Sequence, residues 1–425
     1  VLLTVSLLSC LHLMAQNNVD TLKITLDDAL KIALSENISV QIADQEITRQ
    51  EYAKKGAYTA LFPQVDVTGS YTRTIEKQVM YMDMDVPGMS GGMKVGRDNN
   101  WSAGATASMP LVSAPLWKSL KISAYEVELA VEKARSSRIE MTDQVKRAFY
   151  GVLLAEDAYN VFKEVYDNAI QNYTDIKQKY EKGLAAEYDM IRANVNVKNA
   201  EPNMYDAENS LILAYWQLKV LMGIDLELNI KCTGSLSDFE NNLSEYQASY
   251  ISLDQNSDLN QLDIQFKQLQ RTREMQRAQF LPSLNAQFSY QWMSMNNNFK
   301  IGHYRWDPYS TLGLSLNIPI FSGGKKRTDI KQTEINLKQL SQQRTEVERN
   351  LRLAIKQSTD QMSTCIKQYS AAKAGVAESE KGYSITMKRY ETGEGTLLDV
   401  NDSQLSLTQA RLNLNQSIYN YLVAK

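Results

Sequence analysis

The chain has 425 residues, enough for two or three ordinary domains, and its 46 Lys and Arg nearly balance its 49 Asp and Glu. A net charge of −3 offers no basic surface for nucleic acid, so nucleic acid is not expected as a partner. Gly and Pro are sparse, at 19 and 8 residues, which favours long unbroken elements.

Residues 1–15 are apolar, carry no formal charge and resemble a secretory signal peptide, with residues 13–15 like a peptidase site. A buried N-terminal segment is the alternative interpretation. In a second form of processing, residues 7–10 would act as a loose lipobox and place a lipid on Cys10. Because no initiator Met or basic segment precedes the apolar run, we expect the natural chain to start further upstream.

Residues 65–72 and 101–111 alternate between two kinds of side chain. In both segments the odd-numbered residues are apolar or glycine, and the even-numbered ones up to residue 108 are polar or glycine. A period of two predicts β-strands with two different faces. Segments of this length match what a tilted strand needs to cross a bilayer.

The loop predicted between these strands, at residues 75–100, is rich in methionine. Thioether groups are ligands for Cu(I) and Ag(I), which would suit a metal exporter. The simpler interpretation is a flexible surface loop, so we expect no metal site. The methionines concerned are Met80, Met82, Met84, Met89 and Met93.

A seven-residue apolar repeat runs through residues 117–180 and is broken only at Arg138. It predicts a long coiled-coil helix, followed by a turn that contains Gly and a return helix over 187–222. Pro202 lies inside the return helix and is expected to kink it. Residues 223–257 break the pattern and are expected to form an irregular side element.

The second half of the chain repeats the first. The sequence YEKG at 180–183 returns as YETG at 390–393, and LFP at 61–63 returns as FLP at 280–282. Each half is predicted to run as helix, strand, loop, strand, long helix, turn and long helix. We therefore divide the mature chain into a first repeat, a side element and a second repeat, at 16–222, 223–257 and 258–425.

The elements of the second repeat follow from the same patterns. Even-numbered residues are apolar in 284–292 and 312–320, which predicts two further strands with one apolar face each. A less regular apolar seam predicts a long helix over 325–390, and a return helix is expected over 396–423.

The polar faces of the four predicted strands carry a single charge, Asp66; the other groups are small and neutral. This pattern fits a water-filled lumen on one side and lipid on the other, and a soluble half-buried sheet is the alternative. Four strands cannot close a barrel, and an open edge in lipid leaves backbone groups unpaired. Copies must therefore pool strands: three chains would give twelve, although two or four satisfy the same arithmetic.

Over residues 20–425 this duplicated layout resembles the TolC family of outer membrane efflux proteins. The resemblance implies a mainly α fold with β, in which a trimer builds a 12-stranded β-barrel and a periplasmic α-helical tunnel. The implied function is a passive export duct in the outer membrane, one part of a tripartite efflux or secretion system. The implied partners are two sister copies, a periplasmic adaptor, an inner-membrane transporter and outer membrane lipid.

In this family the hairpin turns dock onto the adaptor. Gly183 and Gly393 match the family's turn glycine, and Gly395 with Thr396 resembles its Gly-Thr pair. Gly395 has no counterpart in the first turn, which weakens the transfer to that turn. The alternative is that Gly183 and Gly393 only end helices in the left-handed conformation.

The family closes its tunnel with aspartates just beyond the second turn, and Asp399 and Asp402 match those positions. Residues three apart lie on one helix face, so three copies would place six carboxylates around a narrow, cation-selective pore. The alternative is helix capping, which favours Asp in the first turn. Arg192 occupies the first-half position that corresponds to Asp402, and we expect it to be a partner for a carboxylate of a neighbouring copy.

Catalysis has little support in the sequence. Outside the predicted signal segment, one histidine and two cysteines remain, His303, Cys232 and Cys365, too few for the usual triads or zinc sets. No phosphate-binding Gly motif is present, so we expect neither an enzyme nor a cofactor. The rival to a channel is a secreted coiled-coil structural or adhesion protein with a small β-domain.

Overall fold

The computed structural model describes residues 21–81, 92–243 and 252–425. Within them the chain folds into two compact units. We call residues 45–133 and 254–347 the sheet unit. Both units take segments from both halves of the sequence, so they cut across the predicted repeats, and the division into repeats stays a prediction.

The remaining described residues form the hairpin unit, which comprises 21–44, the described part of 134–253, and 348–425. The two longest helices contribute to both units. They are α3 (Ala114–Glu181) with 68 residues and α6 (Lys325–Glu391) with 67.

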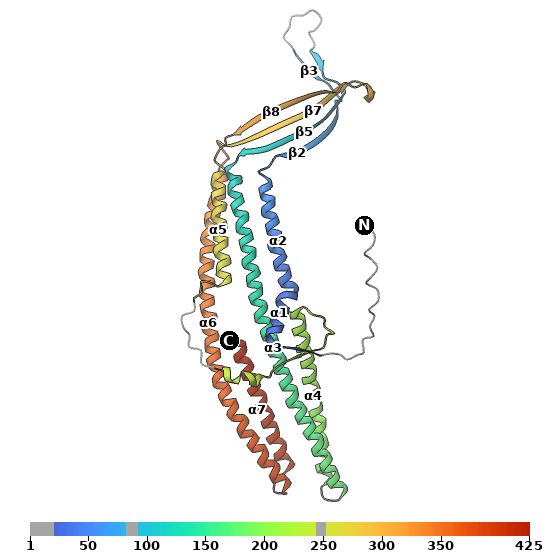
Figure 1. Cartoon of the computed structure of the whole chain (residues 1–425), viewed down its shortest axis with the longest axis vertical. Coiled ribbons are helices and arrows are strands. Elements are labelled where there is room, and N and C mark those ends of the chain that lie inside the picture. Colours follow the sequence, from blue (N-terminus) through green and yellow to red (C-terminus); the bar gives the residue numbers. More distant parts are fainter. Residues whose placement is uncertain (1–20, 82–91, 244–251) are drawn as a thin grey trace, which may run out of the picture. The chain divides into compact units, whose positions relative to one another are not determined.

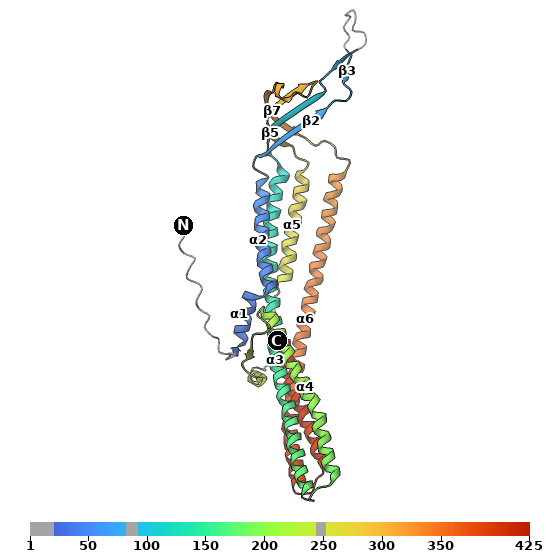
Figure 2. The ribbon, with the colours of Figure 1, turned by 90° about the vertical axis from the view of Figure 1, so that its right-hand side faces the viewer.

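The sheet unit is built on four antiparallel strands in the order β2-β5-β7-β8 (Figures 1 and 2). Each repeat supplies two adjacent strands, as the alternation predicts. The strands are β2 (Gln64–Arg73), β5 (Asn99–Val112), β7 (Ser283–Asn296) and β8 (Asp307–Asn317).

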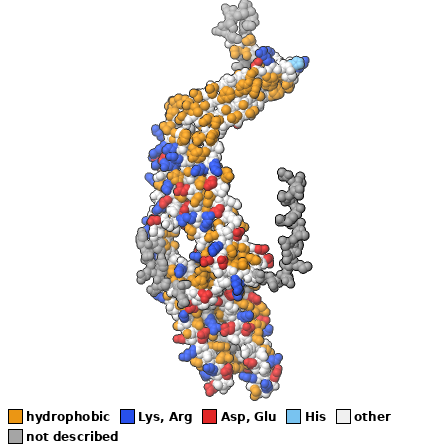
Figure 3. Space-filling model, in the orientation of Figure 1, with side chains coloured by type: hydrophobic (Ala, Val, Ile, Leu, Met, Phe, Trp, Pro, Cys, Tyr) orange, Lys and Arg blue, Asp and Glu red, His pale blue; other side chains and the backbone are white. Residues whose placement is uncertain are grey.

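The strand register places the two kinds of side chain on opposite faces of the sheet. Val67 pairs with Ala105, and Ala105 pairs with Tyr290. One residue along, Asp66 pairs with Thr106 on the other face. The apolar face is open in the single chain, with Val67 81% exposed, and Figure 3 shows hydrophobic side chains gathered over the strands.

The prediction for the last strand was wrong in its bounds. β8 begins at Asp307 and ends at Asn317, whereas alternation suggested residues 312–320. Asn317 pairs with Ser283, the first residue of β7, so no partner backbone remains for the residues that follow. Pro319 also lacks an N–H group to donate to a neighbouring strand.

Short elements flank the sheet. The methionine-rich segment is not wholly a loop, because β3 (Gln78–Met80) and β4 (Met93–Val95) form a small antiparallel pair in which Met80 faces Met93. Met82, Met84 and Met89 lie outside the described residues. The other elements are η2 (Ile301–His303), α5 (Ser257–Ala278) and most of α2 (Ile38–Thr59).

The helical predictions are confirmed to within a few residues. The return helices are α4 (Glu187–Met222) and α7 (Leu397–Ala424). α4 continues through Pro202 as one helix, so the predicted kink stays a prediction.

The core of the hairpin unit gathers around the segment that was expected to be irregular. In its described residues this segment contains β6 (Ile230–Cys232) and η1 (Leu236–Asn242). β6 pairs in parallel with β1 (Leu22–Ile24), which leads into α1 (Leu26–Glu36). Strands of three residues are too short to show a period, which is why the sequence did not reveal them. The largest fully buried side chains of this core are Ile24, Phe149, Leu153, Leu218, Met222, Leu236 and Ile418.

Candidate functional site

The two hairpin turns have the same backbone geometry. Gly183 and Gly393 both adopt the left-handed conformation, with φ of 71° and 80°. The Gly183 N–H donates to the Tyr180 carbonyl at 2.8 Å, and the Gly393 N–H donates to the Tyr390 carbonyl at 3.1 Å. The prediction that these glycines end helices is therefore confirmed. The docking role of these glycines stays a prediction.

The second turn differs from the first at Gly395 and Thr396. A Cβ atom on Gly395 would lie 3.2 Å from the Arg389 Cβ and from the Tyr390 nitrogen, so a larger side chain would crowd the end of α6. Thr396 is the N-cap of α7. The first turn has Ala186 at its N-cap, with no side-chain cap.

Asp399 is committed to the cap of α7. Its carboxylate accepts the Thr396 N–H at 3.0 Å and the Thr396 hydroxyl at 2.8 Å, and its own N–H donates to that hydroxyl oxygen at 3.2 Å. These bonds, led by the one from the Thr396 backbone, lower the pKa of Asp399. The capping alternative thus describes the contacts of Asp399, and its place in a gate stays a prediction.

Asp402 stands one turn deeper and is free of the cap. Its side chain is exposed, and it makes no hydrogen bond or ion pair with another residue of the described chain. Arg192 is half-buried on α4 and makes no ion pair with Asp402 within the described chain. Arg192 and Asp402 are thus not in contact within one protomer, and the expected partnership of Arg192 with a carboxylate of a neighbouring copy stays a prediction.

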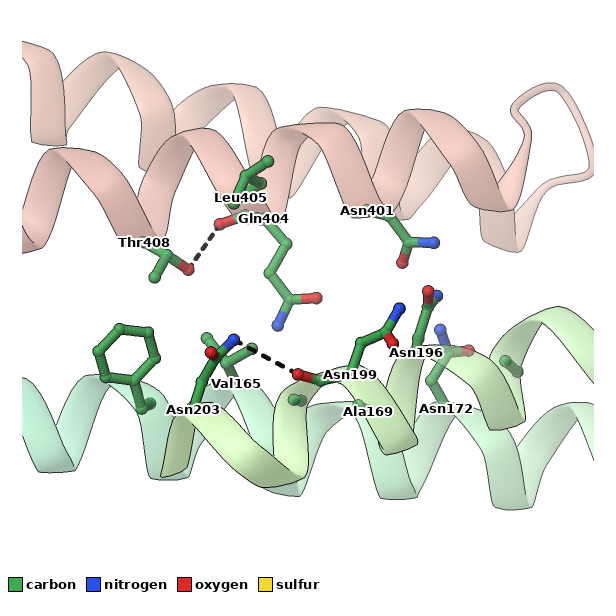
Figure 4. A pocket seen from close by; sticks show the side chains of 13 residues that line it. Val165, Ala169, Asn172, Asn196, Asn199, Asn203, Asn401, Gln404, Leu405 and Thr408 are labelled. Carbon is green, nitrogen blue, oxygen red and sulfur yellow. Dashed lines mark hydrogen bonds between the residues drawn. The ribbon is translucent and has the colours of Figure 1, made fainter. Parts of the chain in front are cut away.

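A cavity of about 300 Å³ lies beside these two residues, between the two helical hairpins. Figure 4 shows amide side chains that approach it from α4 and α7. Ala193 and Asn401, the neighbours of Arg192 and Asp402, both line it. Its amides can donate and accept hydrogen bonds without net charge. They belong to Asn172, Asn196, Asn199, Asn203, Asn401 and Gln404.

The sequence analysis missed this cavity, although one signal was present. Asn196, Asn199 and Asn203 are spaced three and four residues apart, which places them on one face of α4. One of these amides already bonds within the helix, because the Asn203 Nδ2 donates to the backbone carbonyl of Asn199 at 3.4 Å. What the sequence alone could not show is that α7 lies opposite this face.

Two kinds of contact join the hairpins. Near the turns, Ile176, Ala193 and Leu397 form a buried cluster that draws on α3, α4 and α7. Further along, the Arg411 guanidinium on α7 donates to Glu164 on α3 at 2.9 Å and to Glu380 on α6 at 3.0 Å. Arg411 thus ties its own hairpin to the other.

Arg411→Ala should loosen the two hairpins with little loss of stability. Exposed ion pairs contribute roughly 0.2–1 kcal/mol each, so the fold survives, but α3 and α7 lose their charged link. We expect faster amide hydrogen exchange along the neighbouring turns of both helices. Arg147→Ala is the matched control, because Arg147 pairs at 2.7 Å with Asp143 of the same helix. Equal exchange in the two variants would show that Arg411 does not link the hairpins.

The described residues offer little else of chemical character. They contain no group of three or more His, Cys, Asp or Glu placed to hold a metal ion. Cys232 and Cys365 are buried free thiols. None of the described helices combines the length and apolar character needed to cross a membrane.

Paired long helices, a duplicated topology and a two-faced sheet define the class of outer membrane channels. The family model of outer membrane efflux proteins matches residues 29–224 and 248–425, and the chain belongs to this family. It is thus an outer membrane channel protomer of the efflux and secretion type, with its helical portion in the periplasm. The structural or adhesion alternative is not favoured.

Individual relatives are distant but cover most of the chain. The outer membrane protein TolC of Vibrio cholerae is 22% identical over 371 residues, 86% of this chain and 81% of that protein. The alkaline protease secretion protein AprF of Pseudomonas aeruginosa is 22% identical over 411 residues, 95% of this chain and 83% of the relative. The crystal structure of the Campylobacter jejuni CmeC outer membrane channel matches with a TM-score of 0.75 and 19% identity, covering 94% and 83% of the two chains.

Proposed function

We propose that three copies of this chain form one passive export duct. Their strands close a single barrel of twelve, their helices form a tunnel, and Asp402 from each copy narrows its periplasmic end. A periplasmic adaptor meets the hairpin turns, and an inner-membrane transporter supplies the energy. The protein itself performs no catalytic step.

The observation that carries this proposal is the pair of open sheet edges. β2 and β8 end the sheet on either side, and the outer edge of each pairs with no other strand of the described chain. Every residue of both strands is exposed in the single chain. A sheet with an apolar face cannot leave such edges unpaired in lipid, so β8 of one copy must meet β2 of the next.

The contacts of the two candidate aspartates favour Asp402 over Asp399 as the gate residue of this proposal. Asp399 already satisfies its carboxylate in the cap, whereas the exposed carboxylate of Asp402 has no partner among the described residues. Three such carboxylates around one axis would attract cations and repel one another. Arg192 is half-buried and occupies the first-half position that corresponds to Asp402, so the Arg192 of an adjacent copy would offset this repulsion.

The hairpin turns support the docking role by their shape. Both turns are fixed by a left-handed glycine, and Leu184 in the first is 76% exposed, an apolar side chain without cover in the single chain. Gly183, Gly393, Gly395 and Thr396 are therefore kept as the adaptor-contacting residues.

Conductance in planar bilayers tests the channel and its gate together. The purified protein should form discrete, cation-selective channels, and Asp402→Ala should raise conductance and reduce cation selectivity. Asp167→Ala, at an exposed position of α3, is the control and should behave as the wild type. Unchanged conductance in Arg192→Ala would remove that residue from the gate. Absence of conductance from every variant would refute the duct.

A further inference from the structure

A cluster of cations lies where α5 and α6 meet the strands. We call it the basic patch, and Figure 3 shows Lys and Arg side chains gathered there, next to the hydrophobic surface of the strands. The acids within the same turns are Asp329 and Glu334 on α6 and Glu274 on α5, and Glu274 already pairs with Lys118 and Arg271, so positive charge is in excess. The patch consists of Arg273, Arg277, Lys325, Lys326, Arg327 and Lys331.

Contacts between the two helices hold part of the patch in place. The Lys326 ammonium donates to the Gln279 carbonyl at 2.6 Å. Glu334 pairs with Lys331 at 3.0 Å and with Arg277 at 3.4 Å. The hydrogen bond from Lys331, followed by the nearby Arg277 and Arg273, lowers the pKa of Glu334, so one carboxylate serves three cations.

Two cations of the patch keep donors unused. Arg273 has a buried Nε with no hydrogen-bond partner in the described structure. Arg327 is exposed at the start of α6 and makes no ion pair with another described residue. A buried donor without a partner is uncommon in proteins, and Arg273 therefore has capacity for one more acceptor.

Large apolar side chains border the patch on the side of the strands. We call them the apolar fringe, and they occupy the connections that enter β7 and leave β8. Lys326 joins the two surfaces, since its ammonium lies 5.3 Å from the centre of the Phe280 ring. The fringe consists of Phe280, Leu281, Ile318, Ile320 and Phe321, which are 42%, 54%, 55%, 94% and 89% exposed.

We propose that the basic patch and the apolar fringe together bind an anionic phospholipid of the leaflet that faces the periplasm. The phosphate and the negatively charged headgroup lie against the cations, and the first part of the acyl chains covers the fringe. This inference rests on the proposed function, which places the sheet in the membrane.

The order of the two surfaces favours lipid over other anions. A free phosphate or an acidic protein segment would use the cations but leave Ile320 and Phe321 without an occupant. A phospholipid carries its charged headgroup directly beside its acyl chains. The protein surface has the same order, with apolar side chains next to the strands and cations further along the helices. Excess positive charge selects anionic over zwitterionic headgroups.

Native mass spectrometry of the detergent-purified protein, with phosphatidylglycerol or phosphatidylcholine of equal chain length, tests this assignment. The wild type should prefer phosphatidylglycerol. In the triple variant R277Q/K325Q/R327Q the ratio of bound phosphatidylglycerol to bound phosphatidylcholine should fall roughly tenfold, because each Lys or Arg beside an anionic headgroup strengthens its binding. The control K338Q/R349Q/K367Q removes three exposed cations of the same helix further from the strands and should keep it.

Equal lipid preference in the two triple variants would overturn the assignment. A second result would also overturn it: millimolar inorganic phosphate displaces phosphatidylglycerol, and I320S/F321S binds lipid as the wild type does. That combination would describe a simple anion site. Bilayer conductance of every variant checks folding and separates the two proposals. A wild type that conducts but shows no preference for phosphatidylglycerol refutes only the lipid site, whereas a wild type that needs no amphiphile refutes the duct as well.

Discussion

Gly223→Ala is expected to destabilise the hairpin unit by about 2–4 kcal/mol, far more than an ordinary glycine substitution. Gly223 ends α4 with φ of 70° and ψ of 23°. A Cβ atom there would lie 2.6 Å from the Glu36 carbonyl oxygen and 3.1 Å from the Asn37 Cα. Both are backbone atoms at the end of α1, so no side-chain movement relieves the overlap.

The surroundings make this site rigid. Asn37 is 7% exposed, and its Nδ2 donates to the Leu221 carbonyl at 2.9 Å, which binds the end of α1 to the end of α4. Moving one helix end away from the other would break this bond and open the buried core beside it. The overlap caused by the Cβ atom therefore strains the buried core beside the two helix ends.

Gly183→Ala provides the matched control for Gly223→Ala. Gly183 has nearly the same φ, 71°, but a Cβ atom there would meet nothing within 4 Å. The only cost of Ala at this position is that of placing a residue with a Cβ atom in the left-handed conformation, about 1 kcal/mol. Thermal unfolding in detergent should show a clearly larger loss for Gly223→Ala. Similar losses in the two variants would mean that the contact with α1 is not rigid.

The long elements were predictable because their patterns extend over many residues. The apolar repeat before Tyr180 covers nine heptads, so the helix could be predicted despite the interruption at Arg138. Arg138 itself is explained by the structure, since its guanidinium forms an ion pair with Asp44 of α2 at 2.5 Å. A charged residue in an apolar seam can thus be accommodated by a partner that sequence alone does not reveal.

Features that depend on a distant partner were not predictable. β1 and β6 are three residues long and exist because each supplies the other's backbone hydrogen bonds. The end of β8 is set by where β7 begins, not by the alternation, which continues to Ile320. The amide-lined cavity likewise requires two hairpins to face each other, and neither hairpin carries that information in its own period.

At the candidate site the sequence separated the two aspartates only in part. Thr396 and Asp399 have the spacing of a capping box, and the structure shows that box formed. Asp402 has no such partner among the described residues, so the structure separates two aspartates that the sequence placed together in the gate. Bringing the three copies of Asp402 together requires assembly, and the sequence around Asp402 carries no information about the contacts between copies.

Val67→Arg is expected to abolish the assembled channel, whereas Thr68→Arg should be tolerated. The two residues are adjacent in β2 and exposed, and they lie on opposite faces of the sheet. An Arg on the lipid face of a membrane barrel costs about 2–4 kcal/mol near the bilayer centre, and three copies carry it at once. An Arg that faces a water-filled lumen has no such cost, and Thr68 pairs with Gly104, which has no side chain to obstruct it.

Heat-resistant trimers on SDS gels and channel insertion into planar bilayers measure this difference. Val67→Arg should give neither, and Thr68→Arg should give trimers with altered ion selectivity, because its new charges would line the lumen. The pair is informative because both variants add one Arg to the same strand, on opposite faces of the sheet. Equal behaviour of the two variants would mean that the two faces meet the same solvent, and a barrel of pooled strands would then be excluded.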